Sequence, residues 1–391
     1  MDKEFQMSKQ TKRELLQQIK PNYLKLTSKK EKGILLDEYC KHTKMDRKYV
    51  ISLLSPKKDL AIRKLVGRKP KAWTYTAEDI YWVKKIWKVM DYACGQRLAP
   101  YIGPMIKKLR QFGELDIPDS IAKKIKHISK STIDRRLKKY RQELKRRLIT
   151  TTKPGTLLKS QIPIKTKSWD EKRTGYCELD SVAHCGSSAK GQFVNSINLT
   201  DLVTQWTEGE AILGKAQKRV IKALNNAGNR LPSGLKGIDP DNGGEFINWG
   251  VFEYTKQKKI EFTRGRPYKK NDNAHIEQKN WTHVRQIFGY QRYETEKQVR
   301  LMNDIYRNEL RLYKNFFIPN VKLISKKRVG KNGEKIKRKY DRPRTPYERV
   351  MRSKQISKEK KAELKKIYDK LNPAELRRNL KIKLDRLKKI K

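Results

Sequence analysis

The sequence contains few cysteines, lacks long apolar runs and is short of acidic residues. Its four cysteines among 391 residues are too few and too scattered for a disulfide framework or a zinc knuckle, which indicates a reduced intracellular protein. No apolar run approaches the roughly 20 residues needed to cross a bilayer, and the first ten residues do not resemble a signal peptide. These absences lead us to expect a soluble, cytoplasmic protein with no membrane partner.

Basic residues are in large excess. The chain has 95 Lys and Arg against 42 Asp and Glu, a formal net charge of +53, and the bases recur along its whole length. A compact protein with this charge repels itself unless a polyanion screens it, so nucleic acid is the expected partner. The alternative is that the lysines only solvate the surface. The length allows about two to four domains.

Residues 1–149 show the periodicity of amphipathic helices and two outlines of a helix-turn-helix. In 32–54 a polar break at 43–46 separates two helical halves, and the second half offers Arg47 and Lys48 to DNA. We predict one such DNA-binding domain over 1–70. Ordinary amphipathic hairpins with solvated basic faces remain the alternative.

The second outline lies in 120–147, within a predicted helical domain over 71–149. Its break is at 127–130, and Ser131 with Asp134 predicts a capping box at the start of the next helix. We expect that helix to present four cations to DNA: Arg135, Arg136, Lys138 and Lys139. Residues 150–170 lack periodicity and contain two prolines, which predicts a linker.

Beyond residue 170 the periodicity of the apolar residues changes to two, which is typical of strands. The predicted strands are 175–182, 191–201, 204–213, 235–238 and 260–263, and the predicted helices are 215–231, 245–259 and 273–289. This order indicates an α/β domain over 171–292. A basic C-terminal region over 293–391, with a small β unit in 322–350 and a helical tail broken at 372–373, is predicted to bind DNA.

Three acids fall where such a fold would bring them together. Asp180 lies on the first strand, Asp241 just past the fourth, and Glu277 in the first turns of the last helix. With the first strand central and the fourth beside it, these carboxylates repel one another unless a multivalent cation holds them. Ligands that are all oxygen favour Mg²⁺ or Mn²⁺. Two such ions about 4 Å apart stabilise both the attacking and the leaving oxygen of a phosphodiester displacement.

The motifs around these acids resemble a known enzyme family. The pattern is similar to the catalytic core of retroviral-type integrases and insertion-sequence transposases. It consists of CELDSV, then IDPDNGGEF, then HIEQKNWTHVR, with 35 residues between Asp241 and Glu277. VAHCG and RPYKKNDNAHIEQKNW resemble one bacterial transposase group closely. The resemblance covers residues 150–350 well and the N-terminal helices more loosely. It implies an RNase H-like fold and Mg²⁺-dependent phosphoryl transfer without a covalent enzyme–DNA intermediate.

The resemblance also implies a role for each acid. Asp180 would bridge two ions, Asp241 would bind one of them and Glu277 the other. The ions would be Mg²⁺, with Mn²⁺ as a substitute. Around them, four basic residues of the last helix and the loop before it are expected to contact DNA phosphates: Lys269, Lys270, Lys279 and Arg285.

Other polar residues near the three acids are given structural roles. Glu178 shares a strand face with Asp180 and is expected either to support the site or to be solvated. Asp239 is expected to cap the turn, Glu245 to be the N-terminal acid of the following helix, and Asp272 to be a loop residue. His184 and Cys185 suggest zinc, but a partly buried structural pair is favoured.

Three functions remain open at this stage. The first is a transposase of a mobile element, which cuts the element ends and integrates them into target DNA. Such an enzyme would act on double-stranded DNA in the prokaryotic nucleoid as a homodimer or a higher multimer. The second is a nuclease of the RNase H type, which would not need two site-recognition units. The third is a DNA-binding regulator with an inactive integrase core, which would have no reason to keep three acids.

Overall fold

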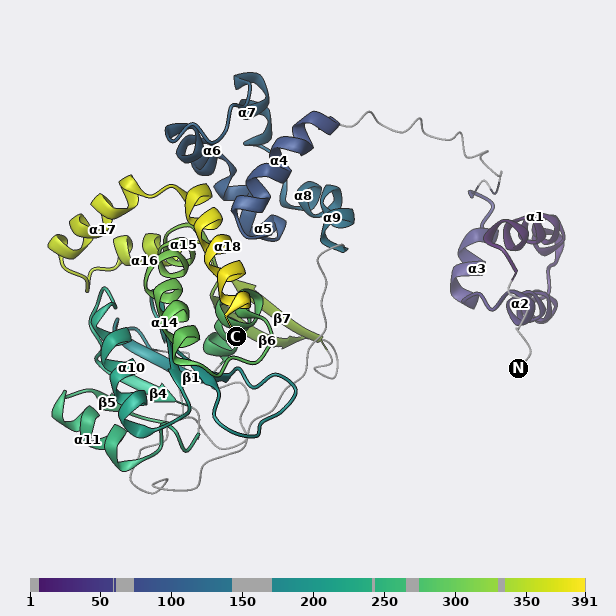
Figure 1. The fold of residues 1–391 in the computed structure, drawn as a ribbon. Helices are drawn as coiled ribbons and strands as arrows, with labels where there is room; N and C mark the ends of the chain where they lie inside the picture. The colour runs from purple at the N-terminus through teal and green to yellow at the C-terminus, as the bar shows by residue number, and fades with distance from the viewer. Residues whose placement is uncertain are drawn as a thin grey trace. The chain divides into compact units, whose positions relative to one another are not determined.

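The computed structural model describes residues 7–58, 60, 74–142, 171–240, 243–264, 274–329 and 335–390. The chain divides into two compact units, Met1–Thr74 and Tyr75–Lys391. Figure 1 shows the elements of each unit. No helix among the described residues is long and apolar enough to cross a membrane.

In its described residues, the first unit contains three helices, α1 (Lys9–Lys25), α2 (Lys29–Thr43) and α3 (Arg47–Leu54). Lys44, in the left-handed region with φ 52°, ends α2, and the Asp46 side chain accepts from the backbone N–H of Tyr49 to start α3. The two predicted helical halves and the break between them are therefore confirmed. One face of each helix packs into a small apolar core, formed by Leu16, Leu36, Tyr39, Val50, Leu54 and Leu60.

The second unit begins with a run of short helices: α4 (Ala77–Val89), α5 (Gly95–Leu98), η1 (Ala99–Tyr101), α6 (Ile102–Gln111), α7 (Asp119–Ile125), α8 (Lys130–Arg136) and α9 (Lys138–Gln142). The capping box predicted at Ser131 is wrong. Ser129 caps α8 by accepting from Thr132 N–H at 3.2 Å. Asp134 accepts instead from Gly95 N–H at 2.7 Å, so its side chain is engaged with α5, which lies far away in the sequence.

A five-stranded mixed sheet forms the centre of this unit. Its strands are β1 (Tyr176–Ala183), β2 (Val194–Asp201), β3 (Thr207–Leu213), β4 (Gly237–Pro240) and β5 (Glu261–Phe262), in the order β3-β2-β1-β4-β5. β1 pairs antiparallel with β2 and parallel with β4; β2–β3 is antiparallel and β4–β5 parallel. β1 is therefore the central strand, flanked by a hairpin strand on one side and a crossover strand on the other.

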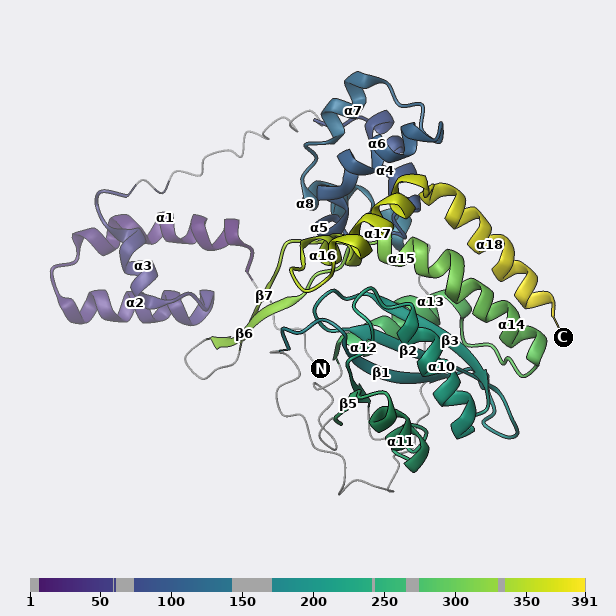
Figure 2. The same ribbon diagram turned by 90° about the vertical axis from the view of Figure 1, so that its left-hand side faces the viewer.

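The helices of the sheet domain follow the predicted order. They are α10 (Gln217–Asn229), α11 (Trp249–Gln257) and α12 (Ala274–Lys279), and the last continues through the π-helical segment η3 (Asn280–Arg285) into α13 (Gln286–Phe288). α10 packs against β2 and β3, whereas α12 packs against β1 and β2 (Figure 2). The predicted β-β-β-α-β-α-β-α sequence of elements is confirmed.

The remaining elements extend the same unit. They are α14 (Glu296–Ile305), η4 (Tyr306–Leu310), α15 (Arg311–Phe317), the ribbon β6 (Leu323–Val329) and β7 (Lys335–Tyr340), α16 (Pro346–Arg352), α17 (Lys358–Lys370) and α18 (Pro373–Lys389). The small β unit and the helical tail are confirmed, and the break falls as predicted because Asn372 caps α18 and Pro373 opens it.

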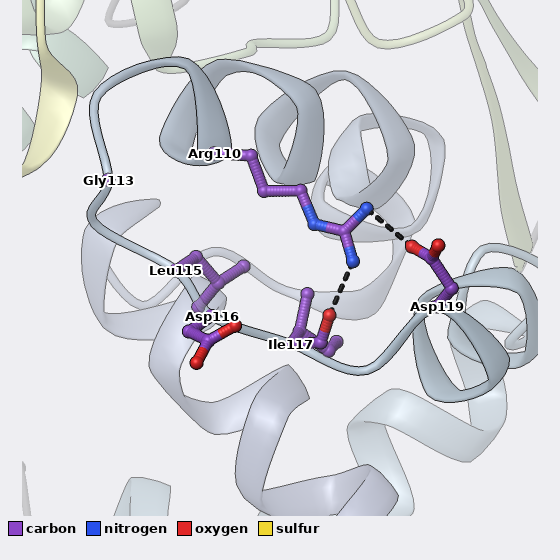
Figure 3. A pocket seen from close by; sticks show the side chains of 6 residues that line it. All are labelled: Arg110, Gly113, Leu115, Asp116, Ile117 and Asp119. Atoms are coloured by element: carbon purple, nitrogen blue, oxygen red, sulfur yellow. Dashed lines mark hydrogen bonds and ion pairs between the residues drawn. The ribbon is translucent and has the colours of Figure 1, made fainter.

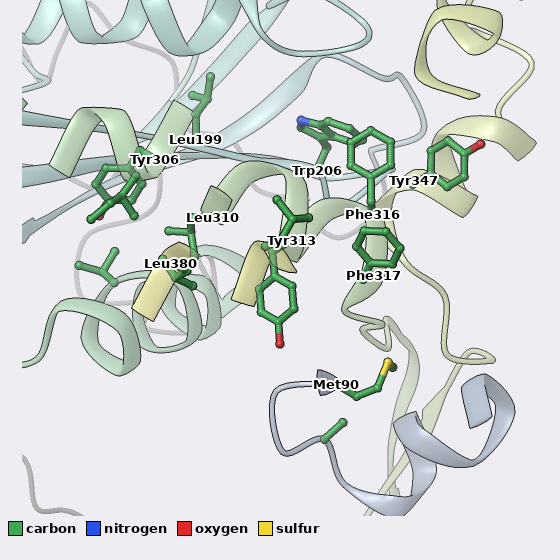
Figure 4. Close-up of a cluster of buried hydrophobic side chains, with 14 of the residues drawn as sticks. Met90, Leu199, Trp206, Tyr306, Leu310, Tyr313, Phe316, Phe317, Tyr347 and Leu380 are labelled. Carbon is green, nitrogen blue, oxygen red and sulfur yellow. The ribbon is translucent and has the colours of Figure 1, made fainter. Parts of the chain in front are cut away.

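One apolar core links these segments. α14 and α15 pack on β3, and α18 packs on α14, α15 and α4. Figure 4 shows Met90 after α4, Leu199 on β2, Tyr313 on α15 and Leu380 on α18 in this buried cluster. α14 and α15 therefore cover the sheet directly, whereas α4 reaches this core through α18.

Candidate functional site

Asp180 lies on the central strand, next to the strand that leads to Asp241. Leu179 of β1 pairs in parallel register with Pro240, the last residue of β4. Asp180 and Asp241 are the residues that follow these two partners in the sequence. Asp180 is half-buried, whereas Asp241 lies outside the described residues.

The helix that carries Glu277 contacts the strand that carries Asp180. Asn280 Nδ2 donates to Asp180 Oδ2 at 2.5 Å, and Asn280 Oδ1 accepts from Asn198 Nδ2 at 2.7 Å. Asn198 stands opposite Asp180 in the β1–β2 register. The backbone of Glu277 belongs to α12, one helical turn before Asn280, but its side chain lies outside the described part.

Glu178 is buried below the same helix. Its side chain is 0% exposed, and Oε2 accepts from the backbone N–H of Ile276 at 2.7 Å. It occupies the same strand face as Asp180, as alternation requires. Of the two roles expected for Glu178, the solvated one is therefore wrong, and the buried contact with α12 agrees with the supporting one.

The opposite face of β1 holds a separate carboxylate. Ser181 Oγ donates to Glu245 at 2.5 Å, and Lys215 Nζ donates to it at 2.6 Å. Burial raises the pKa of Glu245, but the hydrogen bonds from Lys215 and Ser181 outweigh it, so its pKa lies below the usual value. The prediction that Glu245 starts the following helix is wrong, because α11 begins at Trp249 with Asn248 as its cap.

The structure also corrects the role predicted for Asp239. This residue is 2% exposed within β4 and accepts from Thr263 Oγ1 at 3.1 Å. It does not cap the turn, because the strand continues through Pro240. Asp272, Lys269 and Lys270 lie outside the described residues.

Lys279 does not face the solvent, contrary to its predicted contact with phosphate. It is 4% exposed, and its Nζ donates to Gln205 O at 3.3 Å. Burial, together with the nearby charges of Lys314, Arg349 and Arg97, lowers the pKa of Lys279 to about 7. Helical periodicity alone could not reveal that this face of the helix is covered.

The other predicted DNA contacts differ in exposure. Arg285 is half-buried with its guanidinium 4.8 Å from the centroid of the Tyr290 ring. Arg47 pairs with Asp37 at 2.7 Å, and Lys48 beside it on α3 is exposed. On α8 and α9 three of the predicted cations are exposed: Arg135, Lys138 and Lys139. The fourth, Arg136, is half-buried.

His184 and Cys185, predicted as a partly buried structural pair, are both buried. His184 is 0% exposed, its Nε2 lies 2.8 Å from Ser196 Oγ, and its ring packs edge-on against Phe288 and Tyr293. Cys185 is 8% exposed. Burial, aided by the charge of Arg285, lowers the pKa of His184 to about 3, so the imidazole is neutral in the folded protein.

This burial predicts an acid sensitivity that can be measured. Because the folded pKa of His184 lies below its unfolded value, the unfolded chain binds a proton first as the pH falls below about 6.5. The contribution of neutral His184 to the free energy of unfolding is complete above that pH, and it is lost as the pH falls to about 3. Between pH 6.5 and 4.5, wild type should lose roughly 2 kcal/mol more unfolding free energy than His184→Gln. Urea denaturation at both pH values measures the loss of unfolding free energy, with the exposed His127→Gln as control. Equal losses in wild type and His184→Gln would contradict the prediction.

The carboxylate of Asp180 is a ligand of the kind that suits a hard divalent cation. Asp180 is half-buried, its Oδ2 accepts from the Asn280 amide, and its Oδ1 accepts from the backbone N–H of Ser181 at 2.7 Å. Carboxylate oxygens in a partly buried, oriented position are the donors that Mg²⁺ and Mn²⁺ prefer. Among the side chains that the structure describes, no three His, Cys, Asp or Glu gather to hold a metal, and that set includes neither Asp241 nor the Glu277 side chain.

A surface hollow lies in another part of the second unit. It is lined by residues of α6, α7 and the loop between them, where Arg110 pairs with Asp119 at 2.7 Å and donates to Ile117 O (Figure 3). Arg110 and Asp119 pair with each other and Asp116 is the remaining charged residue of the lining, so the hollow gathers no group of acids that could hold a metal.

Comparison with known proteins identifies one relative. No family model matches the sequence. The chain is 31% identical over 344 residues to a protein of Sinorhizobium fredii (strain NBRC 101917 / NGR234) described as "Uncharacterized protein y4rM". The alignment covers 88% of this chain and 96% of that protein, so the two share nearly their whole architecture.

Proposed function

We propose that the chain, which belongs to the same family as the Sinorhizobium fredii protein y4rM, is a DNA transposase that cuts the ends of a mobile element and joins them to target DNA. The observation that carries this proposal is the hydrogen bond between Asn280 and Asp180. It attaches the helix that carries Glu277 to the central strand, beside the strand that precedes Asp241.

The sheet supports an RNase H-like core as part of this proposal. The resemblance requires the first strand to be central, with the fourth beside it and the last helix across both. The observed order β3-β2-β1-β4-β5 has the first strand central and the fourth beside it, as required, but α12 packs mainly on β1 and β2 rather than across β1 and β4. A sheet of this kind hosts many functions, so the argument for catalysis depends on the three acids.

In the proposed site, Asp180, Asp241 and Glu277 hold two Mg²⁺ ions, with Mn²⁺ as a substitute. When bound, such ions lower the pKa of an attacking hydroxyl and offset the charge on the leaving oxygen. Asn280 holds one oxygen of Asp180, which limits the rotation of that carboxylate. Water would attack first and the DNA 3′-hydroxyl second, each in line with its leaving oxygen.

Double-stranded DNA is the proposed substrate, and the N-terminal unit is proposed to recognise element ends. A net charge of +53 supports a polyanionic partner, and α3 presents Lys48 on an exposed surface. Because two ends must be cut and joined, we propose a dimer or higher multimer on DNA. Its place of action would be the nucleoid in the cytoplasm.

Lys48→Gln should weaken binding to element-end DNA several-fold and reduce the slope of log affinity against log salt by about one. Loss of one phosphate contact releases one fewer condensed counterion, which is the physical reason. Fluorescence anisotropy across a salt series measures both effects. Lys30→Gln, an exposed lysine on α2 of the same unit, is the matched control. An unchanged slope for Lys48→Gln would remove α3 from the proposed DNA surface.

The proposal is tested by incubating the purified chain with Mg²⁺, a target plasmid and DNA made from the sequences that flank its gene. Nicks at the element ends followed by products joined to the plasmid would support a transposase. Nicks without joining would indicate an RNase H-like nuclease instead. Binding without any nick, in Mg²⁺ and Mn²⁺ alike, would indicate a regulator with an inactive core.

A further inference from the structure

The helix that carries Glu277 is attached to β1 on both sides of that residue. On the N-terminal side, the backbone N–H of Ile276 donates to Glu178 Oε2 at 2.7 Å. On the C-terminal side, Asn280 donates to Asp180 Oδ2 at 2.5 Å. Both acceptors lie on one face of the same strand, two residues apart. The backbone of Glu277 is therefore fixed between two contacts with the strand of Asp180.

These contacts matter because the helix is not regular at this point. It changes from α-helical to π-helical hydrogen bonding at Asn280. A π segment shifts the direction of the residues that follow relative to those that precede it. Helix geometry alone therefore does not determine how Glu277 and Asn280 are oriented toward β1, and the contacts to β1 have to determine it.

Burying the carboxylate of Glu178 costs more free energy than a purely structural position requires. Its side chain is 0% exposed, and a buried carboxylate is tolerated only when hydrogen bonds or charges compensate for lost hydration. An apolar side chain of similar size could fill the same space at a lower cost. A charged acceptor, however, forms a stronger bond to a backbone N–H in the first turn of a helix, where the helix dipole also favours negative charge.

We propose that Glu178 is a positioning residue for Glu277: its buried carboxylate holds the N-terminal turn of α12 against β1 and thereby sets the approach of Glu277 to Asp180. The inference rests on the proposed function, because it concerns the geometry of the same metal site. Glu178 itself need not touch the metal or the DNA. Its effect passes through the Ile276 backbone, next to Glu277 in the chain.

Two substitutions separate the contact from the charge. Glu178→Leu removes the acceptor, whereas Glu178→Gln keeps a carbonyl oxygen for the Ile276 N–H but removes the charge. Glu208→Gln is the matched control, because Glu208 is also fully buried but lies on β3, bonded to Trp206, Arg230 and Arg311. The measurements are amide hydrogen exchange at Ile276 without metal, Mn²⁺ affinity by titration, and thermal unfolding.

Glu178→Leu should speed exchange at Ile276 by about tenfold or more and weaken Mn²⁺ binding by about 10- to 100-fold, the usual effect of removing a residue that orients a metal ligand. Glu178→Gln should weaken Mn²⁺ binding several-fold. Glu208→Gln should lower thermal stability but leave Mn²⁺ affinity within about twofold. If Glu178 had a purely structural role, its variants would lose thermal stability but keep their Mn²⁺ affinity, as expected of Glu208→Gln.

Faster exchange with unchanged Mn²⁺ affinity in Glu178→Leu would overturn the inference but leave the metal site standing. Wild type that binds no Mn²⁺ would overturn both the metal site and the inference built on it. If Glu178→Leu does not fold, Glu178→Gln decides: a several-fold loss of Mn²⁺ affinity supports the positioning role, and wild-type affinity overturns it.

Discussion

Glu277→Gln is expected to reduce end cleavage and strand transfer by on the order of 10³-fold or more, with element-end binding within about twofold of wild type. The amide has nearly the shape of the carboxylate but no negative charge, so it cannot hold a divalent ion in the same way. A metal that stabilises the transition state by several kcal/mol contributes a factor of ten for each 1.36 kcal/mol, which sets this scale. Single-turnover nicking of labelled end DNA in Mg²⁺, with a gel-shift assay for binding, measures both quantities.

Glu253→Gln is the control for this experiment. Glu253 is an exposed carboxylate on α11 of the same domain, so its loss removes the same charge without touching the proposed site. Its cleavage rate should equal that of wild type. Undiminished cleavage by Glu277→Gln would remove Glu277 from the catalytic residues, whatever the DNA affinity.

Trp206→Ala should lower the free energy of unfolding by about 3–5 kcal/mol. Trp206 is 0% exposed, its Nε1 donates to Glu208 Oε1 at 2.7 Å, and its ring packs edge-on against Phe316 with centroids 5.4 Å apart. Truncation leaves a large cavity and removes one donor from a buried carboxylate. Chemical denaturation followed by far-UV circular dichroism measures the loss.

Trp206→Phe is the matched variant, because it keeps an aromatic ring but lacks the indole N–H. Its loss should be clearly smaller than that of Trp206→Ala. Phe316 belongs to α15, so these variants also test whether the C-terminal helices stabilise the sheet. A loss below about 1 kcal/mol for Trp206→Ala would show that burial of this indole against Phe316 contributes little to stability.

The order of the elements could be predicted from the sequence because it depends on local patterns. Alternating apolar residues in GYCELDSV identified β1, and the 3.6-residue period after Lys215 identified α10. The placement of Asp180 on a strand and Glu277 in a helix followed from the same patterns. What these patterns could not provide is the neighbour that each side chain meets across the fold.

The errors occurred where a distant segment determines the environment. Lys279 belongs to a helix with many polar residues, and its burial becomes evident only when Gln205, 74 positions earlier, is seen to accept its hydrogen bond. Asp134 was expected to cap its own helix but is bonded to Gly95. Glu245 was assigned to a helix start, whereas the β1 residue Ser181 and Lys215 determine its position.

The positioning contacts were missed for a similar reason. Glu178 was identified only by its alternation with Asp180, and its partner is a backbone N–H, which leaves no trace in residue identity. Asn280 was not singled out, although its spacing of three from Glu277 places the two residues as neighbours on a helix. That spacing was the available signal, and it becomes meaningful only once β1 is known to lie beneath the helix.

The central claim is that Asp180, Asp241 and Glu277 form one metal site. Mn²⁺ binding, followed by the loss of the free-ion electron paramagnetic resonance signal, tests it most directly in wild type, Asp180→Asn, Asp241→Asn and Glu277→Gln. The account predicts tight binding in wild type and at least tenfold weaker binding in each single variant, because each acid contributes a ligand to the same ions. Wild-type affinity in any one of the three variants would contradict the claim.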